Sequence, residues 1–170
     1  MNSIGFAPVA REDSMILVLG SMPGQKSLEE HQYYAHPRNS FWPVMYTLFN
    51  SKDNLDYEQK KQLLLDNKIA LWDVLRECYR EGSLDSDIDQ TTIKVNDFKN
   101  FFKQHKNINA IFFNGTKAEQ LFRKAVLKEL KESYQALNYF RLPSTSPAHA
   151  AMKFEEKCIK WEIIKNYISK

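Results

Sequence analysis

The sequence predicts an α/β fold: a three-layer α/β/α sandwich with a central four-stranded, mostly parallel sheet. Short apolar runs of the kind that form buried strands alternate along the chain with longer segments whose apolar residues recur at helical spacing. Parallel strands are joined by right-handed crossovers, so helices should cover both faces of the sheet. A chain of 170 residues with 43% hydrophobic content is long enough to bury such a core, and we expect one domain over residues 1–170.

The expected elements follow one another in regular alternation. The apolar runs that predict strands are Met15–Leu19, Ile69–Trp72, Ala110–Phe113 and Tyr139–Leu142. The segments that predict helices are Ser40–Phe49, Tyr57–Leu65, Asp97–His105, Lys117–Leu130 and Phe154–Ile168. The polar stretch Arg80–Asp87 follows the second strand, and we expect it to form a loop near the rim of the site.

Composition excludes several classes of protein. The two cysteines, Cys78 and Cys158, lie far apart without a C-x-x-C pattern, which indicates a reducing compartment and argues against a cysteine-held zinc or iron–sulfur site. The N-terminus has no basic segment leading into an apolar stretch, and the longest apolar run, Met15–Leu19, is too short to span a bilayer. We therefore expect a cytoplasmic protein without a membrane partner. The net charge of +3 is mild, so any grip on nucleic acid must come from local placement of charge.

Small residues follow the first and the last predicted strand. The first turn is Gly20-Ser21-Met22-Pro23-Gly24, and the last turn is Pro143-Ser144-Thr145-Ser146-Pro147. In open α/β sheets, the loops at the carboxyl ends of the strands build one shared crevice. Gly, Ser and Pro in such loops let backbone N–H groups approach a phosphate closely. The predicted ligand therefore carries phosphate.

The segment after the first turn is the most specific in the chain. It reads Tyr34-Ala35-His36-Pro37-Arg38-Asn39-Ser40-Phe41-Trp42. The order Gly-x-x-Pro-Gly, aromatic-Ala-His-Pro-x-Asn-x-Phe-Trp, a strand ending Phe-Asn-Gly, and then Pro-Ser-x-Ser resembles the uracil-DNA glycosylase superfamily. The form Gly-Ser-Met-Pro-Gly is similar to that of the hypoxanthine-DNA glycosylase branch, also called DNA-deoxyinosine glycosylases, with the mismatch-specific uracil and thymine glycosylases as nearer cousins than the classical uracil enzymes. The resemblance runs from about Leu17 to Ala150 and implies a four-stranded parallel sheet between helices.

The resemblance implies a monofunctional DNA glycosylase of base-excision repair, located in the cytoplasm at the nucleoid. Such an enzyme flips a deaminated base out of duplex or single-stranded DNA, hydrolyses its N-glycosidic bond and leaves an abasic site for downstream repair enzymes. Hypoxanthine is the favoured base, no metal or organic cofactor is expected, and no motif marks a lysine as a Schiff-base nucleophile. Two alternatives stay open: excision of uracil from mismatches or single strands, and a non-catalytic α/β module that binds phosphate or a nucleotide.

The resemblance assigns a base platform and leaves the catalytic group to be found. Tyr34 matches the family position whose ring stacks on the flipped base, while Phe41 and Trp42 are expected in the core. Many relatives hold the attacking water with an Asp or Asn at the third position of the first turn, where this chain has Met22. We predict Asn39 instead, because its amide can both donate to and accept from a water. The alternative is that Asn39 caps the helix that follows it.

Two further strand ends carry polar side chains. Asp73 stands where relatives have a residue that reads the base, and its carboxylate could accept the N1–H of hypoxanthine or orient the water. Its alternative is an N-cap for a helix starting at Val74. Asn114 can present a donor and an acceptor to a base edge, or it can serve as a turn or N-cap residue. Ser21 and Met22 are expected to line the base pocket.

Both turns are expected to contact the DNA backbone. The residues predicted to do so are Gly20, Pro23, Gly24, Ser144, Thr145 and Ser146. Related enzymes insert a large side chain from the last turn into the duplex gap, whereas only Ala148 and His149 are available here. Leu142 stands where classical uracil enzymes have a histidine that stabilises the departing uracil anion. Both departures disfavour uracil and suit a different base.

Overall fold

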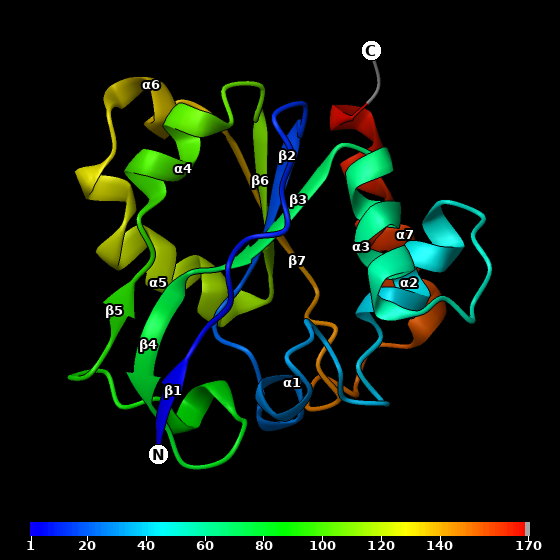
Figure 1. Cartoon of the computed structure of the whole chain (residues 1–170), viewed down its shortest axis with the longest axis horizontal. Helices are drawn as coiled ribbons and strands as arrows, with labels where there is room; N and C mark the ends of the chain where they lie inside the picture. The colour runs from blue at the N-terminus through cyan, green and yellow to red at the C-terminus, as the bar shows by residue number, and fades with distance from the viewer. Residues whose placement is uncertain (169–170) are drawn as a thin grey trace.

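A four-stranded parallel sheet forms the centre of the molecule (Figure 1). The computed structural model describes residues 1–168, and the central sheet has the order β3-β2-β6-β7 with every neighbouring pair parallel. The strands are β2 (Ile16–Gly20), β3 (Ile69–Asp73), β6 (Ala110–Asn114) and β7 (Asn138–Leu142). The predicted α/β class and its four strands are confirmed. Three of the strands run one residue further than predicted at the carboxyl end, so that Gly20, Asp73 and Asn114 are strand residues.

Alternate residues of the central strands face opposite layers of helices. In β2, Ile16 and Val18 belong to one apolar core while Leu17 and Leu19 belong to the other, as the two-residue period of a strand requires. The first core is covered by α2 (Phe41–Leu48), α3 (Tyr57–Asp66) and α7 (Phe154–Trp161), and the second by α4 (Phe98–Gln104) and α5 (Thr116–Ala125) (Figure 1). Both faces of the sheet are buried, which explains the continuous apolar runs of its strands. No helix within residues 1–168 combines the length and the apolar character needed to cross a membrane.

Three helical segments differ from the prediction. The helix predicted over 117–130 ends at Ala125 and is followed by a 3₁₀ turn at Leu127–Glu129 and a short helix, α6 (Glu132–Gln135). Val126 and Leu130, on either side of the 3₁₀ turn, are both buried in the core, where they are 4% and 5% exposed. The last predicted helix likewise changes after Trp161 to a 3₁₀ segment (Glu162–Tyr167). One short helix, α1 (Gln25–Glu30), follows the first turn and was not predicted.

A second, antiparallel sheet was also not predicted. It has the order β1-β4-β5 and consists of β1 (Asn2–Ile4), β4 (Leu75–Tyr79) and β5 (Lys94–Val95). The strands are short and carry few apolar residues, so they give no clear strand pattern. β4 follows β3 almost directly, so this second sheet starts from the end of β3. The loop that begins at Arg80 follows β4 and returns to the first turn. Within that loop, which contains a 3₁₀ turn at Asp85–Asp87, the Ser83 hydroxyl accepts a hydrogen bond from the Gln25 N–H at 2.8 Å.

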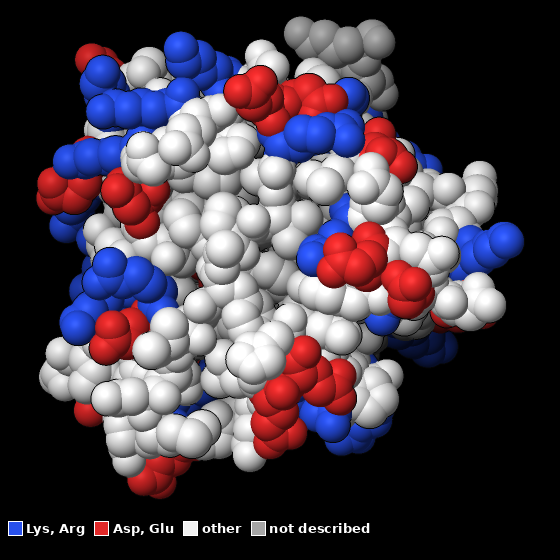
Figure 2. All heavy atoms as spheres, in the orientation of Figure 1, with Lys and Arg blue, Asp and Glu red and all other residues white. Residues whose placement is uncertain are grey.

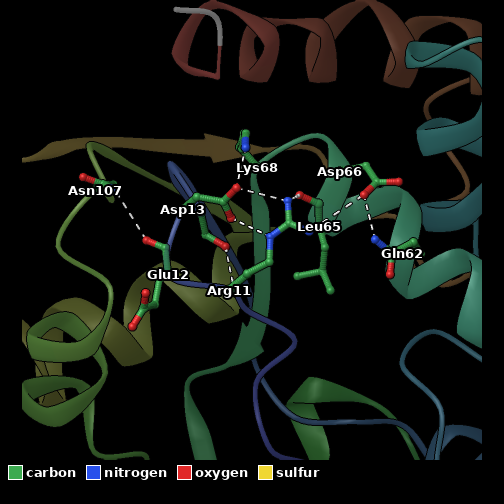
Figure 3. A network of polar contacts seen from close by, with 9 residues as sticks. Arg11, Glu12, Asp13, Gln62, Leu65, Asp66, Lys68 and Asn107 are labelled. Carbon is green, nitrogen blue, oxygen red and sulfur yellow. Dashed lines mark hydrogen bonds and ion pairs between the residues drawn. The ribbon is translucent and has the colours of Figure 1, made fainter.

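The amino ends of the strands are held by an ion-pair network on the edge opposite the turns (Figure 3). Arg11 Nε lies 2.6 Å from Asp13 Oδ1, and Asp13 also pairs with Lys68, which directly precedes β3. Arg11 Nη2 donates to the Leu65 carbonyl at 2.9 Å, which ties the end of α3 to the same network. The hydrogen bonds and charges of Arg11 and Lys68 hold the pKa of Asp13 well below its usual range. The ion pairs at the amino edge of the sheet stabilise the fold, and the candidate site residues lie at the carboxyl edge.

Candidate active site at the carboxyl edge of the sheet

The end of β2 brings together two side chains that the sequence proposed separately. Gly20 pairs in register with Asp73 at the end of β3. A β-carbon added at Gly20 would lie 2.5 Å from Asp73 Oδ1 and 2.9 Å from the hydroxyl oxygen of Tyr34. Both oxygens therefore lie over the same backbone position, and only glycine leaves them room. Gly20 is buried beneath these groups and provides the space for them, and its predicted contact with DNA remains a prediction.

Asp73 is a buried carboxylate with an unusual pKa. Its residue is 3% exposed, and within residues 1–168 its Oδ2 atom has no hydrogen-bond partner. Burial, and then the negative charge of Asp85, raises the pKa of Asp73 to about 7, against the lowering effect of the Arg80 guanidinium. The alternative that Asp73 caps a helix starting at Val74 is wrong, because the chain continues there into strand β4. Asp73 therefore changes charge near neutral pH at a place where its second oxygen is available to a ligand.

Tyr34 holds its ring against the core and its hydroxyl over the strand end. The ring stacks on that of Phe41 with centroids 4.3 Å apart and planes at 25°. Its hydroxyl is buried and makes no hydrogen bond within residues 1–168. Burial, and then the charge of Asp73, raises the pKa of Tyr34 well above its usual range, so the hydroxyl stays protonated. Tyr34 also has a φ of 56°, a left-handed conformation that an aromatic residue rarely adopts and that is often found at functional sites.

The aromatic residues that follow are core residues, as predicted. Phe41 is fully buried and Trp42 is 4% exposed, and both belong to the core between the sheet and α2, α3 and α7. The indole N–H of Trp42 donates to the carbonyl of Tyr33 at 2.9 Å. This bond fixes the loop that carries Tyr34 onto the start of α2.

The side-chain oxygen of Asn39 forms a hydrogen bond at the start of α2. Its Oδ1 accepts the N–H of Phe41 at 2.9 Å, and its own N–H donates to the His36 carbonyl at 2.9 Å. The alternative that Asn39 caps the helix is therefore supported by the bond from the Phe41 N–H. The N-cap position itself is Ser40, whose side chain makes no capping hydrogen bond. The Nδ2 group of Asn39 has no hydrogen-bond partner within residues 1–168. It remains free to hold a water while Oδ1 orders the helix.

Asn114 joins the last turn to strand β6. Its Nδ2 donates to the Thr145 hydroxyl and its Oδ1 accepts the Thr145 N–H, both at 2.9 Å. The N-cap alternative for Asn114 is wrong, because α5 begins after Gly115. Each amide atom of Asn114 keeps one further hydrogen-bonding position for a base edge.

Thr145 is a structural residue of the last turn. It is 1% exposed, its N–H is bonded to Asn114, and its carbonyl accepts the N–H of Ser40 at 3.0 Å. Thr145 connects β6, the last turn and the start of α2, and its predicted contact with DNA remains a prediction. The three segments that carry Asn114, Ser144 and Asn39 are therefore held as one unit.

The rest of the last turn lies at the surface. Ser144 Oγ accepts the Ser146 N–H at 3.1 Å, and Ser146 Oγ accepts the Ala148 N–H at 3.2 Å. Gly115 has a φ of 95° and packs closely against Ser144. A β-carbon added at position 115 would lie 3.1 Å from the Ser144 Cβ. Ala148 and His149 are exposed at the end of the turn, where the sequence placed the residues that face the duplex gap.

The first turn is held from below by residues that the sequence did not single out. The Ser21 hydroxyl donates to Asp85, and the Arg80 guanidinium donates to the Pro23 carbonyl. Arg80 is 1% exposed, and its Nε and Nη1 atoms have no hydrogen-bond partner within residues 1–168. In the sequence, Arg80 and Asp85 are charged residues of an unremarkable polar loop, so no local signal marks them as buried parts of a site.

The remaining residues of the first turn have distinct places. Met22 is 6% exposed and belongs to the hydrophobic core beneath the turn, rather than to the polar groups around Asp73. Pro23 is buried with its carbonyl bonded to Arg80, and its predicted contact with DNA remains a prediction. Gly24 is partly exposed, and the predicted DNA contact remains open for it.

Charge does not mark a broad DNA-binding surface on the face shown in Figure 2. Basic and acidic side chains are interspersed around a largely uncharged centre. With a net charge of +3, the chain has no large excess of either sign. Binding of a polyanion must therefore depend on a few locally placed basic groups rather than on the net charge.

Comparisons with known proteins agree with this geometry. Two curated relatives, from Methanosarcina barkeri and Methanosarcina acetivorans, are named hypoxanthine DNA glycosylase. They are 37% identical over 119 residues (69% of this chain, 74% of the relative) and 38% identical over 115 residues (67% and 72%). The solution NMR structure of a candidate uracil DNA glycosylase from Methanosarcina acetivorans is similar with a TM-score of 0.79 and 32% identity, over 99% of both chains. The family model of the uracil DNA glycosylase superfamily matches residues 7–166, and the chain belongs to this superfamily.

Proposed function

We propose that this chain is a monofunctional DNA glycosylase that hydrolyses the N-glycosidic bond of hypoxanthine in DNA and leaves an abasic site. The observation that carries the proposal is the convergence of the Asp73 carboxylate and the Tyr34 hydroxyl over Gly20, with an unpartnered Asp73 oxygen. Two relatives named hypoxanthine DNA glycosylase support the choice of base.

Asp73 reads the donor that distinguishes hypoxanthine from adenine. Hypoxanthine carries N1–H next to the O6 carbonyl, whereas adenine carries an N1 acceptor next to an amino group. The ionised Asp73 accepts N1–H, and the spare N–H of the Asn114 amide donates to O6. Adenine would place its N1 lone pair against the carboxylate, which is repulsive. The face of the Tyr34 ring that Phe41 does not cover stacks on the base.

Bond cleavage needs a placed water and a stabilised leaving group more than a strong base. As the glycosidic bond lengthens, the sugar becomes cationic and the purine becomes anionic. The Asn114 amide stabilises the negative charge on the purine. Asn39, through its free Nδ2 group, holds the water that attacks the sugar carbon after the bond has largely broken. The water oxygen bonds to the sugar carbon and becomes the new hydroxyl, and the proton that the water loses goes to the departing purine anion, which leaves as neutral hypoxanthine.

The partner is DNA, as duplex or single strand, and the protein acts as one domain over residues 1–170 in the cytoplasm at the nucleoid. Ser144, Ser146 and Gly24 contact backbone phosphates, and Ala148 and His149 face the gap left by the flipped base. The abasic product passes to downstream abasic-site repair enzymes.

The test uses labelled duplexes that carry hypoxanthine, uracil or a G·T mismatch, followed by alkaline cleavage of abasic sites. We expect cleavage at hypoxanthine and much slower or no cleavage at the other two bases. Preferential release of uracil would overturn the proposed substrate, and uracil is the second candidate because its N3–H between two carbonyls offers the same donor to Asp73. Release of no base by folded protein that still binds DNA would overturn the enzymatic function and favour a non-catalytic module.

A further inference from the structure

A pocket beside the site is lined by basic and neutral side chains alone. It has a volume of about 270 Å³ and lies between the start of α2, the last turn and α7. The residues that line it are Arg38, Ser40, Ser146, Pro147, His149, Ala150, Met152, Phe154 and Lys157. No Asp or Glu is among these described residues.

Lys157 is the unusual member of the pocket. It lies on α7 and is only 5% exposed, although lysine is almost never buried without a partner. Its Nζ donates to the His149 carbonyl at 2.9 Å, and within residues 1–168 it makes no ion pair. Burial lowers its pKa, with no nearby carboxylate to offset the effect. An ammonium group has three N–H donors, so two remain beyond the bond to His149.

A buried ammonium without a counter-ion favours an anion in the adjoining space. Removing a charge from water is costly unless a partner of opposite sign compensates it. One backbone carbonyl supplies only a partial negative charge. The Arg38 guanidinium lines the same pocket and adds a second positive charge, while the hydroxyl groups of Ser40 and Ser146 offer neutral donors.

We propose that this pocket is an anion subsite that holds one phosphodiester of the DNA backbone next to the flipped nucleotide, with Lys157 and Arg38 as its charged ligands. The pocket shares Ser146 and His149 with the surface end of the last turn, and Ser40 directly follows Asn39. A strand whose flipped base reaches Asp73 therefore passes the pocket. The identification of the anion as a DNA phosphate rests on the proposed function, whereas the positive character of the pocket does not.

The first measurement is the salt dependence of binding to an undamaged duplex, by fluorescence anisotropy at several KCl concentrations. Lys157→Met removes the charge and keeps an unbranched apolar stem, and Lys160→Met is the matched control because Lys160 is exposed on the same helix and does not line the pocket. Each neutralised phosphate contributes about 0.9 to the slope of log K against log [salt]. We expect the Lys157→Met slope to be smaller by about this amount relative to the control. Equal slopes for the two variants would overturn the subsite.

The second measurement locates the phosphate. Duplexes with a hydrolysis-resistant 2′-fluoro-deoxyinosine carry one neutral methylphosphonate at successive positions on either side of it. We expect one position at which the change weakens wild-type binding by about 10-fold, the size of one charge-assisted hydrogen bond, and leaves Lys157→Met unaffected. The same loss in both proteins at every position would contradict the assignment.

Two controls keep the outcomes separable. Thermal denaturation reports whether Lys157→Met is folded, and Arg38→Gln, which changes an exposed side chain, replaces it in both measurements if it is not. The undamaged duplex contains no substrate base, so the first measurement stands even if the protein excises no hypoxanthine. A changed slope without any excision would retain the anion subsite and reject only the proposed enzymatic function.

Discussion

The Asp73 carboxylate and the Tyr34 hydroxyl meet over Gly20, with Asp73 Oδ1 2.5 Å and Tyr34 Oη 2.9 Å from the place where a β-carbon of residue 20 would stand. One group comes from the end of β3 and the other from the loop between α1 and α2. Neither the Tyr34 hydroxyl nor Asp73 Oδ2 has a hydrogen-bond partner within residues 1–168. Buried polar groups usually have partners, so we expect Asp73 Oδ2 to receive one from the substrate and the Tyr34 hydroxyl to receive one from water.

Gly20→Ala should damage the site. The added methyl group must displace Asp73 or Tyr34, so we expect single-turnover excision to fall by at least about 10-fold and stability to fall by about 1–3 kcal/mol through overpacking. Lys160→Ala is the control, since Lys160 is exposed on α7 and lies outside the proposed contacts. Equal rates for the two variants would show that the space over Gly20 has no role in catalysis.

Asp73→Asn should remove the pH dependence of base recognition. The pKa of Asp73 is raised to about 7, so the acceptor form appears as pH rises through about 7, and wild-type excision should rise over the same range. The Asn variant should lose about 10²-fold in rate and show no step there. A step that persists in the Asn variant would assign the titration to another group.

Asp73 should also make stability depend on pH, and stability should fall over the pH range in which excision rises. Between the unfolded pKa near 3.8 and the folded pKa of about 7, the folded protein binds more protons than the unfolded chain. Its contribution to the free energy of unfolding is therefore complete at low pH and is lost as pH rises through about 7. Urea denaturation at several pH values should show this loss in the wild type and a flatter profile in Asp73→Asn.

Asn39→Ala should affect both chemistry and stability. Loss of the bond to the Phe41 N–H costs about 1 kcal/mol, and loss of the water-holding amide lowers single-turnover excision by about 10²-fold. Asn39→Ser separates the two effects, because serine is a good cap without an amide. We expect the Ser variant to keep its melting temperature and lose the rate. If it keeps both, Asn39 is a capping residue alone.

Tyr34→Ala should weaken binding and excision together. Stacking on a base contributes about 1–3 kcal/mol, and removal of the ring also exposes Phe41. Tyr34→Phe keeps the ring and should remain close to wild type in both measurements. A severe loss in the Phe variant would show that the hydroxyl beside Asp73 contributes more than the stacked ring.

The exposed end of the last turn should make excision depend on the opposing base. Only Ala148 and His149 are available to fill the gap, so the enzyme contributes little to opening a stable pair. Hypoxanthine opposite thymine or in a single strand should be cut faster than hypoxanthine opposite cytosine. Ala148→Leu should narrow the difference between the paired substrates. Unchanged rates for all substrates would mean that this turn does not enter the duplex.

The arrangement of the central sheet and the edge that carries the site were predictable from sequence. Apolar runs of strand length alternate with helical segments, and parallel strands place all their carboxyl ends on one edge. Gly20, Asp73 and Asn114 each follow or end such a run, so their gathering needed no knowledge of long-range contacts. The roles of Asp73, Asn114, Asn39 and Tyr34 remain predictions.

Contacts between distant segments were decided only by the tertiary structure. The Arg80 guanidinium under the first turn and Thr145 between Asn114 and Ser40 have partners far away in the chain, and Lys157 is buried by the packing of α7 although its partner, the His149 carbonyl, is near in sequence. In the sequence, Arg80 and Lys157 are ordinary charged residues of a loop and a helix, because local patterns report periodicity and turns but not which charges the packing removes from water. The strands and the edge of the sheet that carries the site follow from local periodicity, whereas strand order and the burial of a single charge depend on every element that packs around them.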